Sequence, residues 1–360
     1  MRVLLVGSYY PEYLKELYAR APELAQLPYD RQLRQIFGDA FGAGDAYVAG
    51  LRAAGCEAEQ VIVNADAAQA RWAADRQLDL VENIHDRRRQ IVAAQVEDFR
   101  PDVLYVFEWC PLGDAFLADI KPAVRLVAGQ VASPLHANRT YRAFDLMISS
   151  YPPLVDHFRS IGVAAEPMKL AFDERIVQRL RDQSVKYDVT FVGGFAPSHT
   201  DRIDWLEAIL KELPVDVFAY GIERVPADSP IHRCYRGQAW GLRMYEVLQQ
   251  SRVTLNFHAR IEIDGRHDAR FANNMRLYEA TGVGTCLATE YKENLAEMFE
   301  PDREVVAYTS VEDCVGKIKN MLSREDRRRE IAQAGQKRTL REHTYTKRMA
   351  ALRDVLKSHL

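Results

Sequence analysis

Three side chains at the start of one expected helix have types and spacing suited to binding a charged, hydroxyl-bearing ligand. Asn274 is placed to cap the helix, and Arg276 and Glu279 follow in its first turn. A cap of this kind leaves backbone amides and the positive dipole end free for a phosphate, to which Arg276 can add a bidentate contact. Glu279 lies on the same helical face, where a carboxylate can hold both hydroxyls of a ribose. An ordinary capped helix with an exposed Arg–Glu pair explains the same residues, so both interpretations stay open.

Composition indicates a globular protein. The chain has 360 residues, of which 48% are hydrophobic and 28% charged, and this length suits two domains. The formal net charge of -3 argues against non-specific binding to nucleic acid. An apolar strand-like stretch begins directly after Met1 and no apolar run reaches the length of a membrane span, so neither a signal peptide nor a transmembrane segment is expected. Five scattered cysteines predict no disulfide framework and no metal cluster, which favours a cytoplasmic location.

The elements that must position the three side chains follow an α/β pattern, in which short apolar runs alternate with helical stretches. Strands rich in Val, Leu and Ile are typical of parallel sheets buried on both faces. The expected strands span residues 3–6, 59–63, 103–107, 124–127 and 146–149, then 188–192, 215–220, 253–257, 285–288 and 305–308. The expected helices include residues 29–54 with a break near Gly42 and Gly44, residues 86–99, and a charged region over 323–360 with breaks near Gly335 and Thr344.

Because ligands bind at the carboxyl ends of parallel strands, the residues that follow each strand are the other candidates. Read in isolation, a Gly-Gly pair there is a strand-to-helix turn, and a lone histidine is usually a structural hydrogen bonder. The candidates in the first half are Glu108 and His136, and those in the second half are Gly193, Gly194, His199, Arg202, Tyr220, Gly221, Asn256 and His258.

Several motifs carry a resemblance to a known family. They are Asn274-Met-Arg-Leu-Tyr-Glu279-Ala-Thr-Gly282-Val-Gly284, Glu297-Met-Phe, Glu304-Val-Val-Ala-Tyr, Ile331-Ala-Gln-Ala-Gly335, and His343-Thr-Tyr345 with Arg348. Weaker matches in the first half are Tyr29-Asp30, Asp45-Ala-Tyr47 with Leu51, and residues 149–162 and 170–172. On these residues the chain resembles the spore maturation and spore coat glycosyltransferases, whose C-terminal domain is similar to that of group 1 glycosyl transferases.

The resemblance implies the GT-B fold, in which two Rossmann-like α/β domains with parallel sheets face each other across a cleft. It implies an acceptor-side domain over residues 1–172, a donor-side domain over 173–345, and a helix over 346–360 that crosses back to the first domain. The implied activity is metal-independent transfer of a sugar, from a nucleotide-sugar donor of the UDP, GDP or dTDP type, to an acceptor that the motifs do not identify. A role in bacterial glycan or glycoconjugate synthesis would follow.

The resemblance also gives the candidate residues roles. Gly193 and Gly194 would let backbone amides approach the donor, with His199 and Arg202 beside them. Tyr220 and Gly221 would receive the nucleobase, while Asn256, His258, Asn274 and Arg276 would lie along the donor and Glu279 would hold its ribose. Glu108 and His136 are the candidates for a catalytic base.

One departure from the family pattern affects the mechanism. Retaining relatives use a second glutamate that precedes the ribose-binding one by eight positions, and this chain has Phe271 there. An inverting route with a base near the acceptor is therefore open, as are two other functions: a nucleotide-sugar epimerase on the same fold, and a catalytically silent carbohydrate- or nucleotide-binding protein. The sequence lacks a phosphate-binding P-loop, a dinucleotide-binding Gly-x-Gly-x-x-Gly and a Gly-x-Ser-x-Gly elbow, which disfavours kinases, dehydrogenases and hydrolases.

Overall fold

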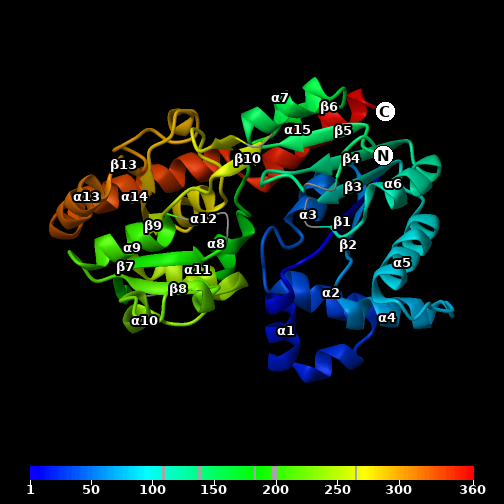
Figure 1. Ribbon diagram of the computed structural model, residues 1–360, viewed down its shortest axis with the longest axis horizontal. Coiled ribbons are helices and arrows are strands. Elements are labelled where there is room, and N and C mark those ends of the chain that lie inside the picture. The colour runs from blue at the N-terminus through cyan, green and yellow to red at the C-terminus, as the bar shows by residue number, and fades with distance from the viewer. Residues whose placement is uncertain (108–109, 137–138, 182–183, 197–200, 264–265) are drawn as a thin grey trace. The chain divides into compact units, whose positions relative to one another are not determined.

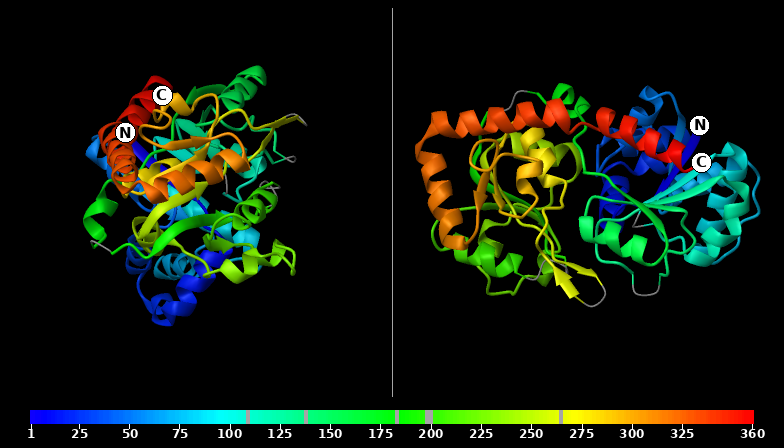
Figure 2. Two further views of the ribbon diagram at one scale, coloured as in Figure 1. Left: turned by 90° about the vertical axis from the view of Figure 1, so that its left-hand side faces the viewer. Right: turned by 90° about the horizontal axis from the view of Figure 1, so that it is seen from above.

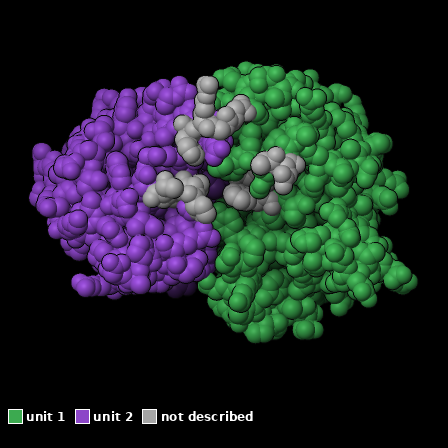
Figure 3. Space-filling model, in the orientation of Figure 1, with its two compact units in different colours: residues 1–169, 346–360 green, residues 170–345 purple. Residues whose placement is uncertain are grey.

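The computed structural model describes residues 1–107, 110–136, 139–181, 184–196, 201–263 and 266–360. The chain forms two compact units, which Figure 3 shows in different colours. Unit 1 comprises residues 1–169 and 346–360, and unit 2 comprises residues 170–345. In the part of the chain that the structure describes, no helix is long and apolar enough to cross a membrane.

Unit 1 is built on a six-stranded parallel sheet with the order β2-β1-β3-β4-β5-β6 (Figure 1). Residues Val3 to Val6 of the inner strand β1 are at most 1% exposed, as expected for a strand covered on both faces. The strands are β1 (Arg2–Gly7), β2 (Glu57–Ile62), β3 (Val103–Phe107), β4 (Leu126–Gln130), β5 (Leu146–Ser149) and β6 (Ala164–Pro167). The helices are α1 (Pro11–Arg20), α2 (Tyr29–Gly38), α3 (Ala46–Ala53), α4 (Asp66–Asp75), α5 (Ile84–Phe99), α6 (Asp114–Ile120), α7 (Pro152–Ser160) and α15 (Tyr345–Ser358).

Unit 2 contains a five-stranded parallel sheet with the order β13-β12-β9-β7-β8. Its strands are β7 (Tyr187–Gly194), β8 (Asp216–Tyr220), β9 (Ser251–Asn256), β12 (Cys286–Glu290) and β13 (Val306–Tyr308). A separate antiparallel hairpin of β10 (Ile261–Ile263) and β11 (Arg266–Asp268) projects from the unit, as the yellow arrows of Figure 2 show. The helices are α8 (Arg175–Arg179), α9 (Arg202–Leu210), α10 (Ile231–Cys234), α11 (Gly241–Gln249), α12 (Arg276–Gly282), α13 (Val311–Ser323) and α14 (Glu325–Glu342).

The core of unit 2 joins its sheet to the helices that cover it. Val189, Val253 and Leu255 from the central strands are at most 1% exposed, and they pack with Leu206 of α9 and Ile318 of α13. Burial of side chains of this size stabilises a fold by about 1.5–3 kcal/mol each. This packing holds the carboxyl ends of β7 and β9 in fixed positions.

Two glycines that the sequence marks as helix breaks behave differently. The expected break near Gly42 and Gly44 is confirmed, because α2 ends at Gly38, α3 begins at Ala46, and both glycines have positive φ. The expected break at Gly335 is wrong, because α14 continues through it. A Cβ atom at Gly335 would overlap the backbone oxygen of Glu304, so close packing explains this glycine.

Candidate functional site

The strand order of unit 2 creates a crevice at the ends of two neighbouring strands. From β7 the chain passes to β8 on one side, and it then returns to form β9 on the other side of β7. Such a reversal of strand order leaves an opening at the carboxyl ends of the two central strands, where ligands of open α/β sheets bind. Here those ends are Gly194 of β7 and Asn256 of β9.

Arg202, the first residue of α9, lies at this opening. Its guanidinium donates hydrogen bonds to the backbone oxygens of Gly194 and of Phe257, the latter at 3.2 Å. The residue is 9% exposed, and burial lowers the pKa of the guanidinium to about 10. Arg202 therefore remains a cation at neutral pH and joins the two strand ends that flank the crevice.

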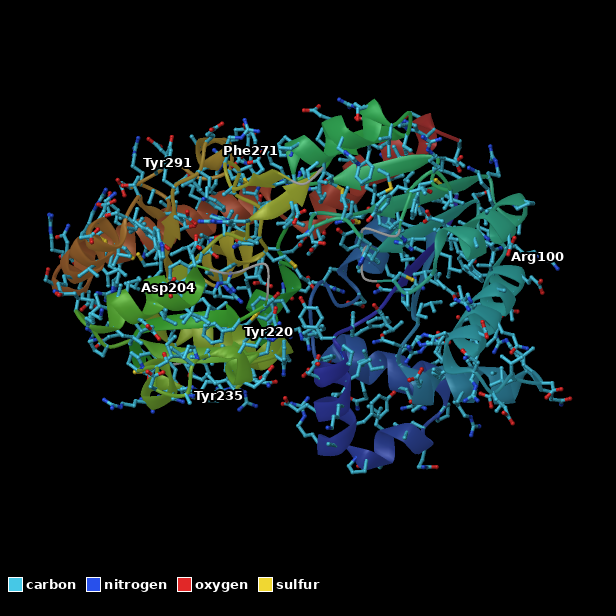
Figure 4. The ribbon with its side chains drawn as sticks, viewed as in Figure 1. Arg100, Asp204, Tyr220, Tyr235, Phe271 and Tyr291 are labelled. Atoms are coloured by element: carbon cyan, nitrogen blue, oxygen red, sulfur yellow. The ribbon has the colours of Figure 1, made fainter. Side chains whose placement is uncertain are left out.

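Glycines at the ends of β7 and β8 make room for aromatic rings. A Cβ atom at Gly193 would lie 2.8 Å from the ring of Phe191, and one at Gly194 would overlap the ring of Tyr220. Tyr220, labelled in Figure 4 at the end of β8, stacks on Trp240 with a centroid separation of 5.3 Å. Gly221 follows with a φ of +76°, which glycine adopts readily. The carboxyl ends of β7 and β8 therefore combine aromatic rings with glycines that carry no side chain.

Arg276 and Glu279 form a buried ion pair in the first turn of α12. The distance from Arg276 Nη1 to Glu279 Oε2 is 3.0 Å, and the two side chains are 13% and 7% exposed. Burial raises the pKa of the Glu279 carboxyl, and the charge of Arg276 lowers it in part. Nη1 and Nε of Arg276 are buried without a well-aligned hydrogen bond among the described residues. The two residues pair, as the ordinary-helix interpretation expected, but that interpretation is wrong in placing the pair at the exposed surface.

The expected cap of this helix is also wrong. Met275 occupies the N-cap position, and α12 has only seven residues. The side-chain amide of Asn274 instead donates to Oδ1 of Asn256 at 2.7 Å and to the backbone oxygen of Phe257 at 3.2 Å. Asn256 in turn donates to Thr289 Oγ1 at 2.8 Å. Asn274 and Asn256 thus tie the start of α12 to the end of β9.

His258 is buried as a neutral ring. Nδ1 accepts a hydrogen bond from the backbone amide of Asn273 at 3.4 Å, so Nε2 carries the proton and donates to Thr289 at 3.2 Å. Burial, together with the charges of Lys292 and Arg202, lowers the pKa of His258 to about 3. A phosphate contact by a histidine cation at this position is therefore disfavoured, and the ring connects β9 to β12.

The end of β12 contributes groups that the sequence analysis did not select. Glu290 closes the strand and accepts a bond of 2.6 Å from Lys292, whose side chain is 10% exposed. Thr289 joins Asn256 to His258. The expected strand stopped at residue 288, so all three residues follow it closely, and applying the strand-end rule to this strand would have selected them. Trp240 lies outside any strand end, so the rule had no reason to select it.

The remaining candidates lie elsewhere. Glu108 and His199 fall outside the described residues. His136 follows β4 in unit 1, is exposed, and donates its backbone amide to Tyr141 Oη at 3.1 Å. Phe271 lies in unit 2 apart from Tyr220 (Figure 4), with the guanidinium of Arg270 5.2 Å from its ring centroid. Among the described residues, no cluster of three or more acidic, histidine or cysteine side chains is arranged to hold a metal ion.

Comparisons with known proteins agree with this architecture. Residues 199–354 match the family model described as glycosyl transferase-like, and no curated protein matches the chain. The structure of HepE from Anabaena in complex with UDP-glucose is 12% identical with a TM-score of 0.62, over 99% of this chain and 100% of that one. Sucrose-phosphate synthase from Thermosynechococcus elongatus is 10% identical with a TM-score of 0.60, over 99% and 98%. A candidate UDP-N-acetylglucosamine 2-epimerase from Listeria monocytogenes is 11% identical with a TM-score of 0.54, over 99% and 96%. The chain has the GT-B fold, as expected.

Proposed function

We propose that this chain transfers a sugar from a nucleotide-sugar donor to an acceptor, and that unit 2 binds the donor at the ends of β7 and β9 and the start of α12. The glycosyl transferase-like match begins at residue 199 and includes all of α9 and α12. One structural neighbour, HepE, was solved with UDP-glucose. Membership of the spore coat subgroup and a UDP, GDP or dTDP donor are finer parts of the same proposal.

The observation that carries the proposal is the buried guanidinium of Arg276. Its Nε is buried and has no acceptor in the described part of the chain, while Nη1 lies 3.0 Å from Glu279 Oε2. A buried donor without an acceptor costs about 1–3 kcal/mol, and more when it is charged. A diphosphate supplies anionic oxygens of the kind that a guanidinium binds in pairs. A bound diphosphate would therefore recover this free energy.

The charges around Arg276 support an anionic ligand with two negative groups. Arg202 is close enough that Arg276 acts on its pKa, so two buried cations repel each other in the absence of an anion. Glu279 offsets one of them by the 3.0 Å ion pair. We assign Glu279 to the ribose hydroxyls, because an ionised carboxylate accepts hydrogen bonds from a diol. Arg202 would then act through its charge, since its guanidinium already binds two backbone oxygens.

We propose that transfer needs no metal ion. The leaving nucleoside diphosphate gains negative charge in the transition state, and fixed cations can stabilise that charge directly. We assign this role to Arg276 and Arg202. Undiminished turnover of the preferred donor after treatment with EDTA is the expected result, and loss of turnover restored by Mg²⁺ or Mn²⁺ would contradict it.

The test is a binding panel with a matched control variant. Thermal unfolding is followed with UDP, GDP, dTDP, CDP and their common sugar conjugates, because a ligand that binds the native state raises the melting temperature. One nucleotide should raise the melting temperature clearly more than the others, and Glu279→Ala should abolish most of that increase. Glu330→Ala removes a glutamate of the same Arg-x-x-Glu spacing on α14, where Glu330 is 67% exposed and 2.6 Å from Arg327, and should leave the shift unchanged.

Two outcomes would overturn the assignment. An unchanged nucleotide affinity in folded Glu279→Ala would refute the ribose role. A well-folded wild type that responds to none of the nucleotides would refute the donor site of unit 2. Isothermal titration gives the affinities, and an acceptor screen with the preferred donor follows.

An epimerase is the second candidate function, because one structural neighbour is a candidate UDP-N-acetylglucosamine 2-epimerase. Such an enzyme would retain the nucleotide site but change the donor's own ring. Incubation of the preferred nucleotide-sugar without any acceptor distinguishes the two. A new sugar epimer at constant nucleotide-sugar concentration favours the epimerase, whereas an intact donor that is consumed when acceptor is added favours the transferase.

A catalytically silent binding protein is the third candidate, and Phe271 is the observation that favours it. This aromatic residue stands where retaining relatives place a carboxylate, and Arg270 lies 5.2 Å from its ring centroid. Binding of a nucleotide-sugar without turnover across a broad acceptor screen would support this function. Turnover would instead point to an inverting route, for which Glu108 and His136 stay the predicted bases.

A further inference from the structure

The sheet of unit 1 reverses its strand order between β1 and β3, as the sheet of unit 2 does between β7 and β9. Such a reversal leaves a crevice at the carboxyl ends of the two strands. Gly7 ends β1 and Phe107 ends β3, and Gln130 ends the next strand, β4, where it pairs with Phe107 in the sheet. Phe107 and Gln130 are partly exposed, so a ligand can reach both side chains. The crevice does not share residues with the site assigned to the donor.

Two buried tyrosines fix the orientation of the Gln130 side-chain amide. Oε1 of Gln130 accepts hydrogen bonds from the hydroxyls of Tyr47, at 3.0 Å, and of Tyr105, at 2.6 Å. Burial raises the pKa of the Tyr105 hydroxyl well above its usual range, so this hydroxyl stays protonated and donates. If the oxygen and nitrogen of the amide exchanged places, both hydroxyls would lose their acceptor, and each unpaired buried group would cost about 1–3 kcal/mol. Nε2 is therefore held on the side of the amide that faces away from the tyrosines.

Nε2 of Gln130 carries two N–H donors that are open to a ligand. Among the described residues neither donor has an acceptor, and Nε2 is not sealed inside the unit. Because the two tyrosines already hold the amide in place, a ligand that accepts from Nε2 does not have to order it first, which favours binding. The amide therefore offers a fixed, uncharged donor at the carboxyl edge of the sheet.

Phe107 adds an aromatic surface beside this amide. Its ring contacts Tyr47 and Tyr105 edge to face, with centroid separations of 5.1 and 5.5 Å, and it lies over Gly7. These contacts hold the ring in place. The two residues that follow each of β1, β2, β4 and β5 are uncharged, while Glu108, which follows β3, lies outside the described residues. The described part of this edge thus combines an aromatic ring with a fixed amide and carries no cation in these positions.

We propose that this crevice binds the acceptor and that the acceptor is a neutral sugar, whose apolar C–H face packs on Phe107 and whose oxygen accepts a hydrogen bond from Gln130 Nε2. This inference rests on the proposed sugar transfer. An anionic acceptor would find no cation among the described residues that follow these strands, and an ammonium group would meet N–H donors. A purely apolar acceptor would cover Nε2 without pairing it, which is unfavourable. A sugar ring has both an apolar face and oxygen acceptors.

Ligand-observed NMR of the full chain tests the proposal with the methyl glycosides of glucose, galactose, mannose and N-acetylglucosamine. Glucuronic acid and phenol are the anionic and the aromatic comparators, and at least one methyl glycoside should bind more tightly than both. Gln130→Met removes the amide at similar volume and should weaken the affinity for that glycoside by about three- to tenfold, the effect of one uncharged hydrogen bond. Phe107→Leu removes the ring and should weaken it as well. Gln35→Leu, which replaces an exposed glutamine of α2 in the same unit, is the matched control and should change nothing.

Gln130→Met leaves the hydroxyls of Tyr47 and Tyr105 without their acceptor, so thermal unfolding without ligand checks that this variant folds, and Phe107→Leu keeps the proposal testable if it does not. Three results would overturn the proposal: no methyl glycoside binds folded wild type, a comparator binds more tightly than every glycoside, or the folded variants bind the glycoside as tightly as Gln35→Leu does. The affinity for the preferred nucleotide should be the same in all these variants, so failure of the acceptor site is distinguishable from failure of the donor site in unit 2.

Discussion

The two units share one strand order but use it differently. Counted along each parallel sheet, both run second-first-third-fourth-fifth, and the sheet of unit 1 adds a sixth strand, so each has its crevice between its first and third strands. In unit 1 these strands end at Gly7 and Phe107, and the ring of Phe107 packs over the glycine. In unit 2 the corresponding strands end at Gly194 and Asn256, and the guanidinium of Arg202 joins the backbone beyond them.

The side chains around the crevices also differ between the two units. Next to Phe107, the hydroxyls of Tyr47 and Tyr105 donate to Gln130 Oε1 at 3.0 and 2.6 Å, which gives an uncharged network. In unit 2, by contrast, Arg276 acts on the pKa of Arg202, and Lys292 and Arg202 both act on the pKa of His258; the side chains of Arg276 and Lys292 are 13% and 10% exposed. A fold fixes where ligands bind, and the side chains decide which ligands they are. These cations are the reason that we propose a diphosphate site in unit 2.

The largest expected effect is on Arg276. Arg276→Met removes the cation whose donors are unsatisfied, and the affinity for the preferred nucleoside diphosphate should fall by about 10- to 100-fold. The variant also leaves Glu279 buried without its ion partner, which should lower the free energy of unfolding by about 3–5 kcal/mol. Isothermal titration and urea unfolding measure the two effects.

The double variant Arg276→Met/Glu279→Leu separates them. Replacing both charges by apolar groups should recover most of the lost stability, because no buried charge is left unpaired. Nucleotide affinity should stay low. Recovery of affinity together with stability would mean that Arg276 acts through folding and does not contact the ligand, and the comparison between the units would lose its main support.

A pH titration sharpens the comparison through His258. Its pKa is about 3 in the folded chain and about 6.5 when unperturbed, so the folded state binds the proton more weakly. The stability that results is present above pH 6.5 and is lost as the pH falls from 6.5 toward 3. Relative to His258→Gln, wild type should lose about 2.5 kcal/mol between pH 7 and pH 4.5, at about 1.4 kcal/mol per unit. Urea unfolding of both proteins at the two pH values checks this, and parallel pH profiles would show that the ring is not held neutral.

Much of the scaffold follows from sequence pattern. Strand 103–107 has the predicted bounds and strand 146–149 likewise, because both are short, apolar and bounded by turns. β6 was not predicted, since Ala164–Pro167 is partly exposed at the edge of the sheet and lacks an apolar run. Gly335 was interpreted as a helix break because no nearby residue gives a reason for a glycine inside a helix. The reason is its close contact with the backbone of Glu304, which is distant in sequence. The local sequence pattern indicates buried strands and turns, but it does not indicate contacts between segments that are distant in the sequence.

The candidate site shows the same limit. The pairing of Arg276 with Glu279 was predictable, because residues three apart share a helical face. Their burial was not predictable from the sequence. Burial decides whether the two residues form an ordinary surface ion pair or part of a binding site. Asn274 has the residue type of a cap, yet its amide binds Asn256, 18 residues earlier in the chain. Tertiary hydrogen bonds replaced the local one, and nothing in the spacing of the two asparagines signals this.

The smallest expected effect compares equivalent glycines at the ends of the first strand in each unit. A Cβ atom at Gly194 would overlap the ring of Tyr220, which stacks on Trp240 and has little freedom to move, so Gly194→Ala should cost about 1–3 kcal/mol. At Gly7 the added atom would lie 3.0 Å from Phe107, and a shift of a few tenths of an ångström accommodates it, so the cost should stay below about 1 kcal/mol. Urea unfolding measures both variants. Gly194→Ala should also weaken nucleotide binding by displacing Tyr220, while Gly7→Ala should not. If both variants lost the same free energy of unfolding and kept the same nucleotide affinity, the two strand ends would be equivalent. The functional difference between the units would then have to rest on the charges of Arg202 and Arg276.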